Sequence, residues 1–147
     1  MSLIEKIDND LKQAMRARDE ARLSTIRMLK SAIKYVAIEK SGALGDAEIV
    51  QVIQKQIKQR RESIQQFRDG GRSEMAAKEE KEASILEGYL PKQINPEELK
   101  NIVEQEVRAQ GASTKKDFGR MMKHLNDKLA GSADNKRLSE ILGGLLK

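Results

Sequence analysis

Apolar residues recur at intervals of three and four positions along almost the whole chain, and this spacing constrains the fold more than any other feature of the sequence. It is the period of a helix with one buried face, whereas a half-buried strand alternates apolar and polar residues. The chain is also poor in the aromatic residues that strands favour, at 3% of all residues. The sequence therefore predicts an all-α fold.

Four predicted helices fill the first part of the chain. The first begins at a capping box formed by Ser2 and Glu5, and the second is capped by Asp19. The third starts at Asp46 after the segment "EKSGALGD" and stops at "DGGR", and the fourth covers Ser73–Tyr89. Because each helix has an apolar side, we expect a four-helix, bundle-like domain.

The segment "PKQINP" contains both prolines of the chain, Pro91 and Pro96. The residue before a proline is pushed out of helical geometry, so a helix that reaches this segment ends there. We therefore expect an N-terminal helical domain over residues 1–92 and a small C-terminal domain over residues 93–147.

Three shorter helices are predicted for the C-terminal domain. Asn95 caps the first, which ends at Gly111. Thr114 and Asp117 form a capping-box-like start for the second, and Asp134 caps the third. About 50 residues in three helices are within the range that folds independently, although the buried area is small.

The stretch "STKKDFGRMMKHL" combines an apolar and a basic helix face. Phe118, Met121, Met122 and Leu125 have the spacing of a buried face. Cations near a helix N-terminus oppose the helix dipole, so helix stability does not explain the lysines there. Either the basic face binds an anion or it is an ordinary solvated surface. The candidate nucleic-acid-binding residues are Lys115, Lys116, Arg120, Lys123 and His124.

No catalytic residue, metal site or cofactor is predicted. His124 is the only histidine, and no nucleophile with a supporting carboxylate accompanies it in the sequence. A lone histidine is also a poor metal site, and the absence of cysteine excludes thiolate zinc sites, disulfides and thiol nucleophiles. Donation to a phosphate or simple exposure is the preferred interpretation of His124.

Glu79 and Glu82 lie on one face of the fourth helix, together with Met75 and Leu86. Carboxylates on an apolar stripe must be paired or have shifted pKa values. An acid/base pair of the glycosidase kind is one interpretation, but a structural ion-pair network is preferred. Its basic partners would come from Arg27 and from Arg60 or Arg61.

Charge and targeting signals say less about function. The net charge of +5, from 28 Lys and Arg against 23 Asp and Glu, suits a phosphate-bearing partner and also plain solubility. The N-terminal "MSLIEKIDNDL" has neither an apolar signal core nor a transit pattern, and no window is apolar enough to span a membrane. We therefore expect a cytoplasmic protein.

Several runs of the sequence resemble the GatB/YqeY family. They are "LSTIRMLKSAIKYVAIEK", "VIQKQIKQRRESIQQFRDGGRSEMAAKEEKEASILEGYLPKQI", "GASTKKDFGRMMKHL" and "GSADNKRLSEIL". The chain is similar to a free-standing member of the family, and its C-terminal part is similar to the tail of the B subunit of the tRNA-dependent amidotransferase. The resemblance covers nearly the whole chain.

The resemblance implies an all-helical protein of two domains with a role near tRNA. The amidotransferase acts on Glu-tRNA(Gln) or Asp-tRNA(Asn), and its tail helps to hold the tRNA. We therefore expect a tRNA-associated binding or accessory protein, with aminoacyl-tRNA or the amidotransferase machinery as further partners. Two alternatives stay open: a subunit that supports carbon-nitrogen ligase activity with glutamine as amido-N-donor, and a helical protein-interaction module.

Overall fold

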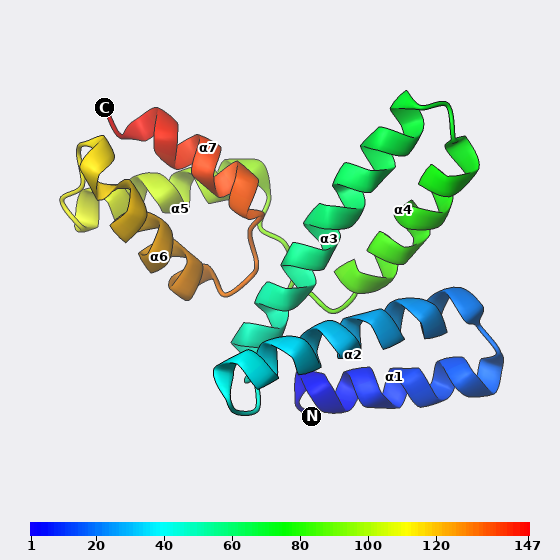
Figure 1. Ribbon diagram of the computed structural model, residues 1–147. Coiled ribbons are helices and arrows are strands. Elements are labelled where there is room, and N and C mark those ends of the chain that lie inside the picture. The colour runs from blue at the N-terminus through cyan, green and yellow to red at the C-terminus, as the bar shows by residue number, and fades with distance from the viewer. The chain divides into compact units, whose positions relative to one another are not determined.

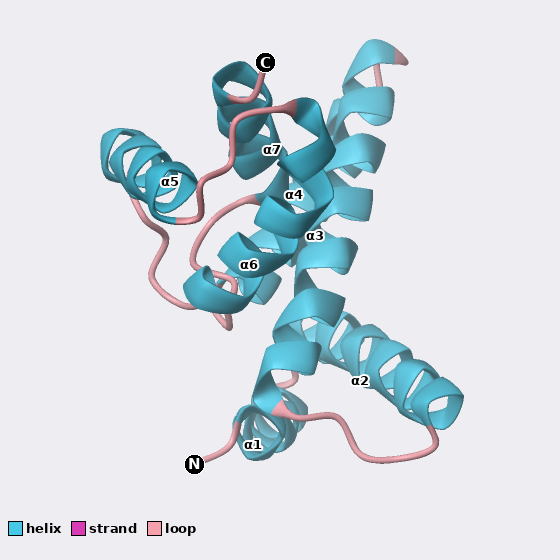
Figure 2. Ribbon diagram, turned by 90° about the vertical axis from the view of Figure 1, so that its left-hand side faces the viewer, coloured by secondary structure: helices cyan, strands magenta, loops and turns pink.

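The computed structural model describes residues 1–147, and all of its regular elements are helices (Figures 1 and 2). The prediction of an all-α fold is confirmed. Contacts within the chain divide it into two compact units, Met1–Leu90 (unit 1) and Pro91–Lys147 (unit 2). No helix combines the length and apolarity that are needed to cross a membrane.

Unit 1 consists of two antiparallel helix pairs. The first pair is α1 (Leu3–Ala17) with α2 (Glu20–Lys40), and the second is α3 (Asp46–Asp69) with α4 (Ser73–Glu87). Figure 1 shows α3 crossing α2, and α2 also contacts α4. Each pair buries its facing apolar sides, and the crossing joins the two pairs into one unit.

Polar side chains cap the starts of α1 and α2, and another links α3 to α1. Ser2 and Glu5 form the predicted capping box, with both hydrogen bonds 3.3 Å long. Asp19 accepts from a backbone N–H in the first turn of α2 at 3.3 Å. The carboxylate of Asp46 accepts from the backbone N–H of Leu3 at 3.1 Å, so it links the start of α3 to the start of α1.

The ends of the second helix pair follow from glycine and proline. Gly71 closes the turn between α3 and α4 with a φ of 73°, a left-handed conformation that favours glycine. Helix α4 ends at Glu87, two residues before the predicted end at Tyr89. The backbone N–H of Tyr89 bonds to the carbonyl of Leu86 at 3.1 Å, which tightens the last turn ahead of Pro91.

The core of unit 1 draws on all four helices and on the segment that follows α4. Its members are aliphatic except for one tyrosine, as the low aromatic content requires. The buried residues are Ile7, Ile26, Leu29, Ile33, Ile49, Val52, Ile53, Ile57, Leu86 and Tyr89.

Unit 2 contains α5 (Pro96–Ala109), a short 3₁₀ helix η1 (Lys115–Asp117), α6 (Phe118–Leu129) and α7 (Asn135–Leu145). The three α-helices pack against one another in pairs. Their buried residues form a core separate from that of unit 1: Leu99, Val103, Ala112, Met121, Leu125, Ala133, Leu138, Leu142 and Leu146.

Capping residues also mark the helix starts of unit 2. Asn95 accepts from the first turn of α5 at 2.8 Å, and Asp134 accepts from the first turn of α7 at 3.0 Å. The predicted start at Thr114 is a 3₁₀ turn, and α6 proper begins four residues later. The predicted capping box of Thr114 and Asp117 is present, and the carboxylate of Asp117 accepts from the backbone N–H groups of Ser113 at 3.1 Å and Thr114 at 3.4 Å.

Candidate functional site

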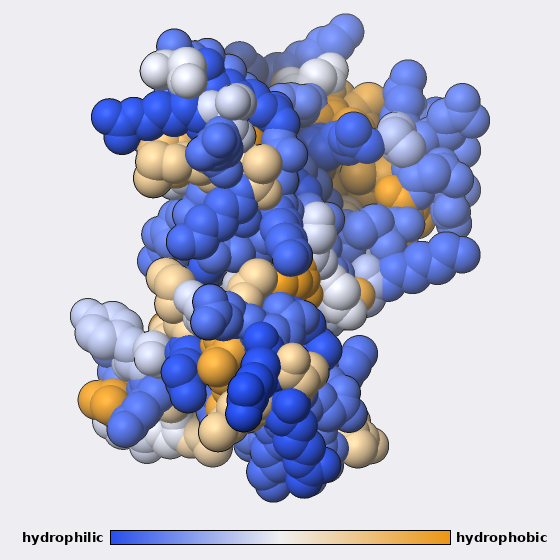
Figure 3. Space-filling model, turned by 90° about the vertical axis from the view of Figure 1, so that its right-hand side faces the viewer, coloured by the Kyte–Doolittle hydropathy of each residue, from blue (hydrophilic) through white to orange (hydrophobic).

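The surface of the protein is hydrophilic, so exposure alone does not single out a binding site. Figure 3 shows one face of the molecule, on which hydrophilic residues predominate and apolar residues form small groups. A more selective property is whether an exposed cation has a carboxylate partner, because a paired side chain is partly neutralised and held in place. The predicted basic residues of unit 2 differ in this property.

Three of the predicted residues are exposed and have no ion-pair partner. Lys115 and Lys116 lie on η1, and Lys123 lies on α6. Met121 and Leu125 of α6 are fully buried, so Lys123 lies on the solvent side of a helix that packs against the core of unit 2. We refer to Lys115, Lys116 and Lys123 as the free lysines.

Arg120 is exposed but paired. Its guanidinium lies 3.2 Å from the carboxylate of Asp117, one turn earlier. The pKa of Asp117 is lowered, first by the backbone N–H groups of Ser113 and Thr114 and then by Arg120. Arg120 therefore helps to fix the start of α6, and its charge is shared with a carboxylate.

His124 connects two helices. Its Nε2 lies 2.7 Å from a carboxylate oxygen of Glu106 on α5, and Lys128 contacts the other oxygen of the same carboxylate. The pKa of Glu106 is lowered, first by Lys128 and then by His124. The structure thus engages His124 with a carboxylate inside unit 2, an arrangement that the sequence interpretation of phosphate donation or simple exposure did not include.

The two acidic residues singled out in α4 share one buried arginine. Arg60 of α3 lies 3.0 Å from Glu79 and also contacts Glu82. The exposed fractions of the Arg60 and Glu82 side chains are 8% and 7%. A cation between both carboxylates is the arrangement of a structural ion pair, because a buried charge needs a partner of opposite sign.

The remaining predicted members of this network lie elsewhere. Arg61 pairs with Glu87 at 3.1 Å, and Arg27 is exposed on α2 with no ion pair. Met75 is 46% exposed, although its spacing from Glu79 predicts a shared apolar face. Periodicity predicts the side of a helix, but the neighbouring helix decides which part of that side is covered.

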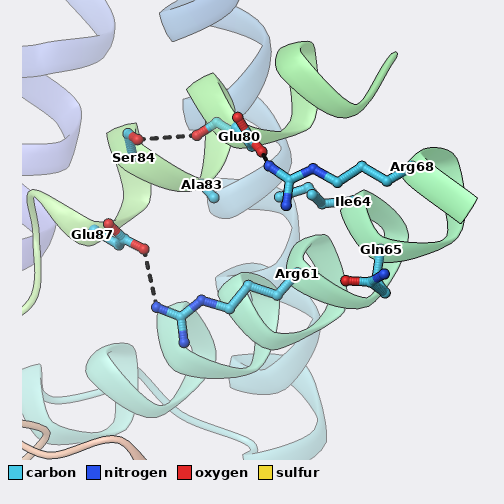
Figure 4. Close-up of a pocket in the computed structure, with 8 residues that line it drawn as sticks. All are labelled: Arg61, Ile64, Gln65, Arg68, Glu80, Ala83, Ser84 and Glu87. Carbon is cyan, nitrogen blue, oxygen red and sulfur yellow. Dashed lines mark hydrogen bonds and ion pairs between the residues drawn. The ribbon is translucent and has the colours of Figure 1, made fainter. Parts of the chain in front are cut away.

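An open depression between α3 and α4 was not predicted from the sequence (Figure 4). Ion pairs between the two helices cross it, Arg61 with Glu87 and Arg68 with Glu80. The sequence signal for it is weak, since the four residues are charged surface positions on two different helices. The lining residues are Arg61, Ile64, Gln65, Arg68, Glu80, Ala83, Ser84 and Glu87.

Tyr89 also has a role that sequence reasoning missed. It is 8% exposed, and its hydroxyl donates to the carboxylate of Asp10 on α1 at 2.6 Å. The ammonium of Lys6 lies 5.6 Å from the ring centroid. Burial, and secondly the hydrogen bond to Asp10, raise the pKa of the Tyr89 phenol. The segment after α4 is thereby attached to α1.

The fold and these contacts define a class: an all-helical protein of two compact units, in which ion pairs join neighbouring helices and other exposed cations have no such partner. The family described as Yqey-like protein matches residues 4–146. The chain therefore belongs to the Yqey-like protein family, as its resemblance to the GatB/YqeY family indicated.

Curated relatives agree with this assignment. The chain is 33% identical to altered inheritance of mitochondria protein 41, mitochondrial, from Clavispora lusitaniae, over 89% of this chain and 78% of the relative. It is 26% identical to the protein of the same name from Pyrenophora tritici-repentis, over 96% of this chain and 81% of the relative.

The names of these relatives contradict the expected location. Both are named mitochondrial proteins, so the expectation of a cytoplasmic protein is wrong. That expectation depended on the absence of a signal or transit pattern, and such an absence does not identify a compartment.

Proposed function

We propose that this protein is a tRNA-associated binding or accessory protein whose unit 2 contacts the sugar-phosphate backbone through the free lysines. The observation that carries the proposal is the difference in ion pairing among the basic residues of the segment from Lys115 to His124. Lys115, Lys116 and Lys123 are exposed without a carboxylate partner, whereas Arg120 and His124 on the same segment have one. Unpaired ammonium groups are free to replace the counterions of phosphates.

The composition supports recognition of backbone and shape over recognition of bases. Single-stranded RNA is usually bound on aromatic side chains that stack with its bases, and only 3% of this chain is aromatic. Phe118, the aromatic residue nearest the free lysines in sequence, packs against the core of unit 2. Charge-assisted contacts to phosphates need no such platform.

A filter-binding titration with tRNA tests the proposal. The variant with Lys115→Gln, Lys116→Gln and Lys123→Gln should bind at least about tenfold more weakly than the wild type. Glutamine is a good helix former, so circular dichroism should show an unchanged fold.

A matched control removes three other unpaired cations of unit 2. Lys100→Gln, Lys136→Gln and Arg137→Gln change the net charge equally on α5 and α7. The control should keep most of the affinity if the free lysines form the contact. Equal losses of tRNA affinity in the two variants would show that only net charge matters, which would contradict a specific contact through the free lysines. A wild type that does not bind tRNA would contradict the whole proposal.

A further inference from the structure

Helix α2 has apolar residues on two sides. One side is buried in the core of unit 1 through Ile26, Leu29 and Ile33. On the other side, Met28, Tyr35 and Ile38 have exposed fractions of 53%, 65% and 67%. The chain has six large hydrophobic side chains that are exposed, and these are three of them. Solvent-exposed apolar residues gathered on one helix side mark an interaction surface.

The exposed residues follow the spacing of a coiled-coil seam. Intervals of four, three, four and three residues separate Ser24, Met28, Ser31, Tyr35 and Ile38, which we call the α2 seam. Three of these five residues are apolar, and residues with this spacing allow a second helix to pack along the first, with its side chains inserted between those of the seam. The small Ser31 between Met28 and Tyr35 leaves room for a larger side chain of the second helix.

Two unpaired cations accompany the seam. Arg27 and Lys34 directly precede Met28 and Tyr35, and both are exposed without an ion pair. Other cations of α2 are neutralised within unit 1: Lys30 lies 2.6 Å from Asp8, and Lys40 contacts Glu48. In a coiled coil, the positions that flank the seam choose the partner by charge. Here one flank selects for carboxylates.

We propose that the α2 seam binds an amphipathic helix of another protein, with apolar residues packed into the seam and acidic residues opposite Arg27 and Lys34. A second copy of this chain in antiparallel pairing would place the same flank against itself, so its cations would repel. In parallel pairing Lys34 would face Glu39 of the copy, but Arg27 would face Ala32 and stay unpaired. An RNA would contact the two cations but would not bury Met28 and Ile38. A helix with an acidic flank satisfies both features.

The test uses the full chain and two synthetic helical peptides of about three heptads, with Leu at the seam positions and either Glu or Lys on both flanks. Fluorescence anisotropy should show that the wild type binds the Glu peptide at least about tenfold more tightly than the Lys peptide. Arg27→Glu with Lys34→Glu should reverse this preference. Lys55→Glu with Lys58→Glu, an equal charge change at exposed positions of α3, should leave it intact.

A second variant tests the apolar part. Tyr35→Ser with Ile38→Ser should weaken binding of the Glu peptide at least about tenfold and leave the melting temperature and tRNA affinity unchanged, because both side chains are exposed. No binding of the Glu peptide, or a preference that survives charge reversal, would overturn the proposal. So would self-association of the wild type that Tyr35→Ser with Ile38→Ser abolishes, since the occupant would then be a second copy.

Discussion

The guanidinium of Arg60 and the carboxylate of Glu82 meet between α3 and α4, where both side chains are more than nine-tenths buried. Glu79 adds a second carboxylate to the same cation at 3.0 Å. A buried charge is tolerated only when it is paired, so the three residues depend on one another. This cluster joins α3, which contains Arg60, to α4, which contains both carboxylates.

Removal of the shared cation should destabilise unit 1 strongly. Arg60→Met leaves the carboxylates of Glu79 and Glu82 without their partner, and loss of one member of a buried pair costs about 3–5 kcal/mol. Urea unfolding followed by circular dichroism measures the change. Lys40→Met, which breaks the exposed pair with Glu48, is the control and should cost about 1 kcal/mol or less. Similar losses in both variants would show that Arg60 is not a structural centre.

The tyrosine after α4 should make stability fall in alkaline solution. Because the pKa of Tyr89 is raised in the folded state, the unfolded chain loses this proton first, above about pH 10. The contribution of Tyr89 is therefore complete below pH 10 and decreases as the pH rises further. Urea unfolding of wild type and Tyr89→Phe between about pH 9 and 11 should show a smaller decrease for the variant. Identical pH profiles would contradict the buried hydrogen bond to Asp10.

Two glycines should respond in opposite directions to replacement by alanine. A Cβ on Gly119, in the first turn of α6, would meet no atom within 4 Å, and its backbone is helical. Gly119→Ala should therefore raise the free energy of unfolding by up to about 1 kcal/mol. Gly71 has a φ of 73°, so Gly71→Ala should lower the free energy of unfolding. A lower free energy of unfolding for Gly119→Ala would contradict the open, helical environment of this glycine.

Unit 2 should fold without unit 1. It has its own core, and the side chain of Gln93 donates to the carbonyls of Pro91 and Gly131 at 2.9 and 3.0 Å. A fragment of residues 91–147 should show helical circular dichroism and cooperative melting at modest stability. A fragment that stays unfolded would make the core of unit 2 dependent on the first four helices, and the expected boundary after residue 92 would lose its meaning as a domain boundary.

The helices could be predicted closely from the sequence because their signals are local. Each N-cap side chain bonds to a backbone N–H no more than three residues away, as seen for Ser2, Asp19, Asn95 and Asp134. Pro91 likewise prevents the helical segment before it from continuing. The capping box of Thr114 and Asp117 was predicted as well, but the 3₁₀ geometry of the turn that it closes was missed. Local patterns predict where a helix lies more reliably than how its first turn is built.

The candidate sites could be predicted only in part, because ion pairing is decided between helices. The sequence left Arg60 and Arg61 as equal partners for Glu79 and Glu82, and the packing of α3 against α4 pairs Arg60 with both carboxylates and Arg61 with Glu87. In the same way, the sequence grouped His124 with Lys123 as candidate binding residues. In the structure Glu106 of α5 pairs with His124, whereas Lys123 has no ion pair. The spacing of residues along one helix does not predict where a second helix packs against it.

The salt dependence of tRNA binding tests the central claim most directly. If Lys115, Lys116 and Lys123 contact phosphates, a plot of log affinity against log salt concentration should be steep for the wild type. The slope should fall by about one unit or less for each lysine replaced by glutamine, and so by about two to three units for all three. An unchanged slope in the triple variant, at any affinity, would contradict a phosphate contact through the free lysines.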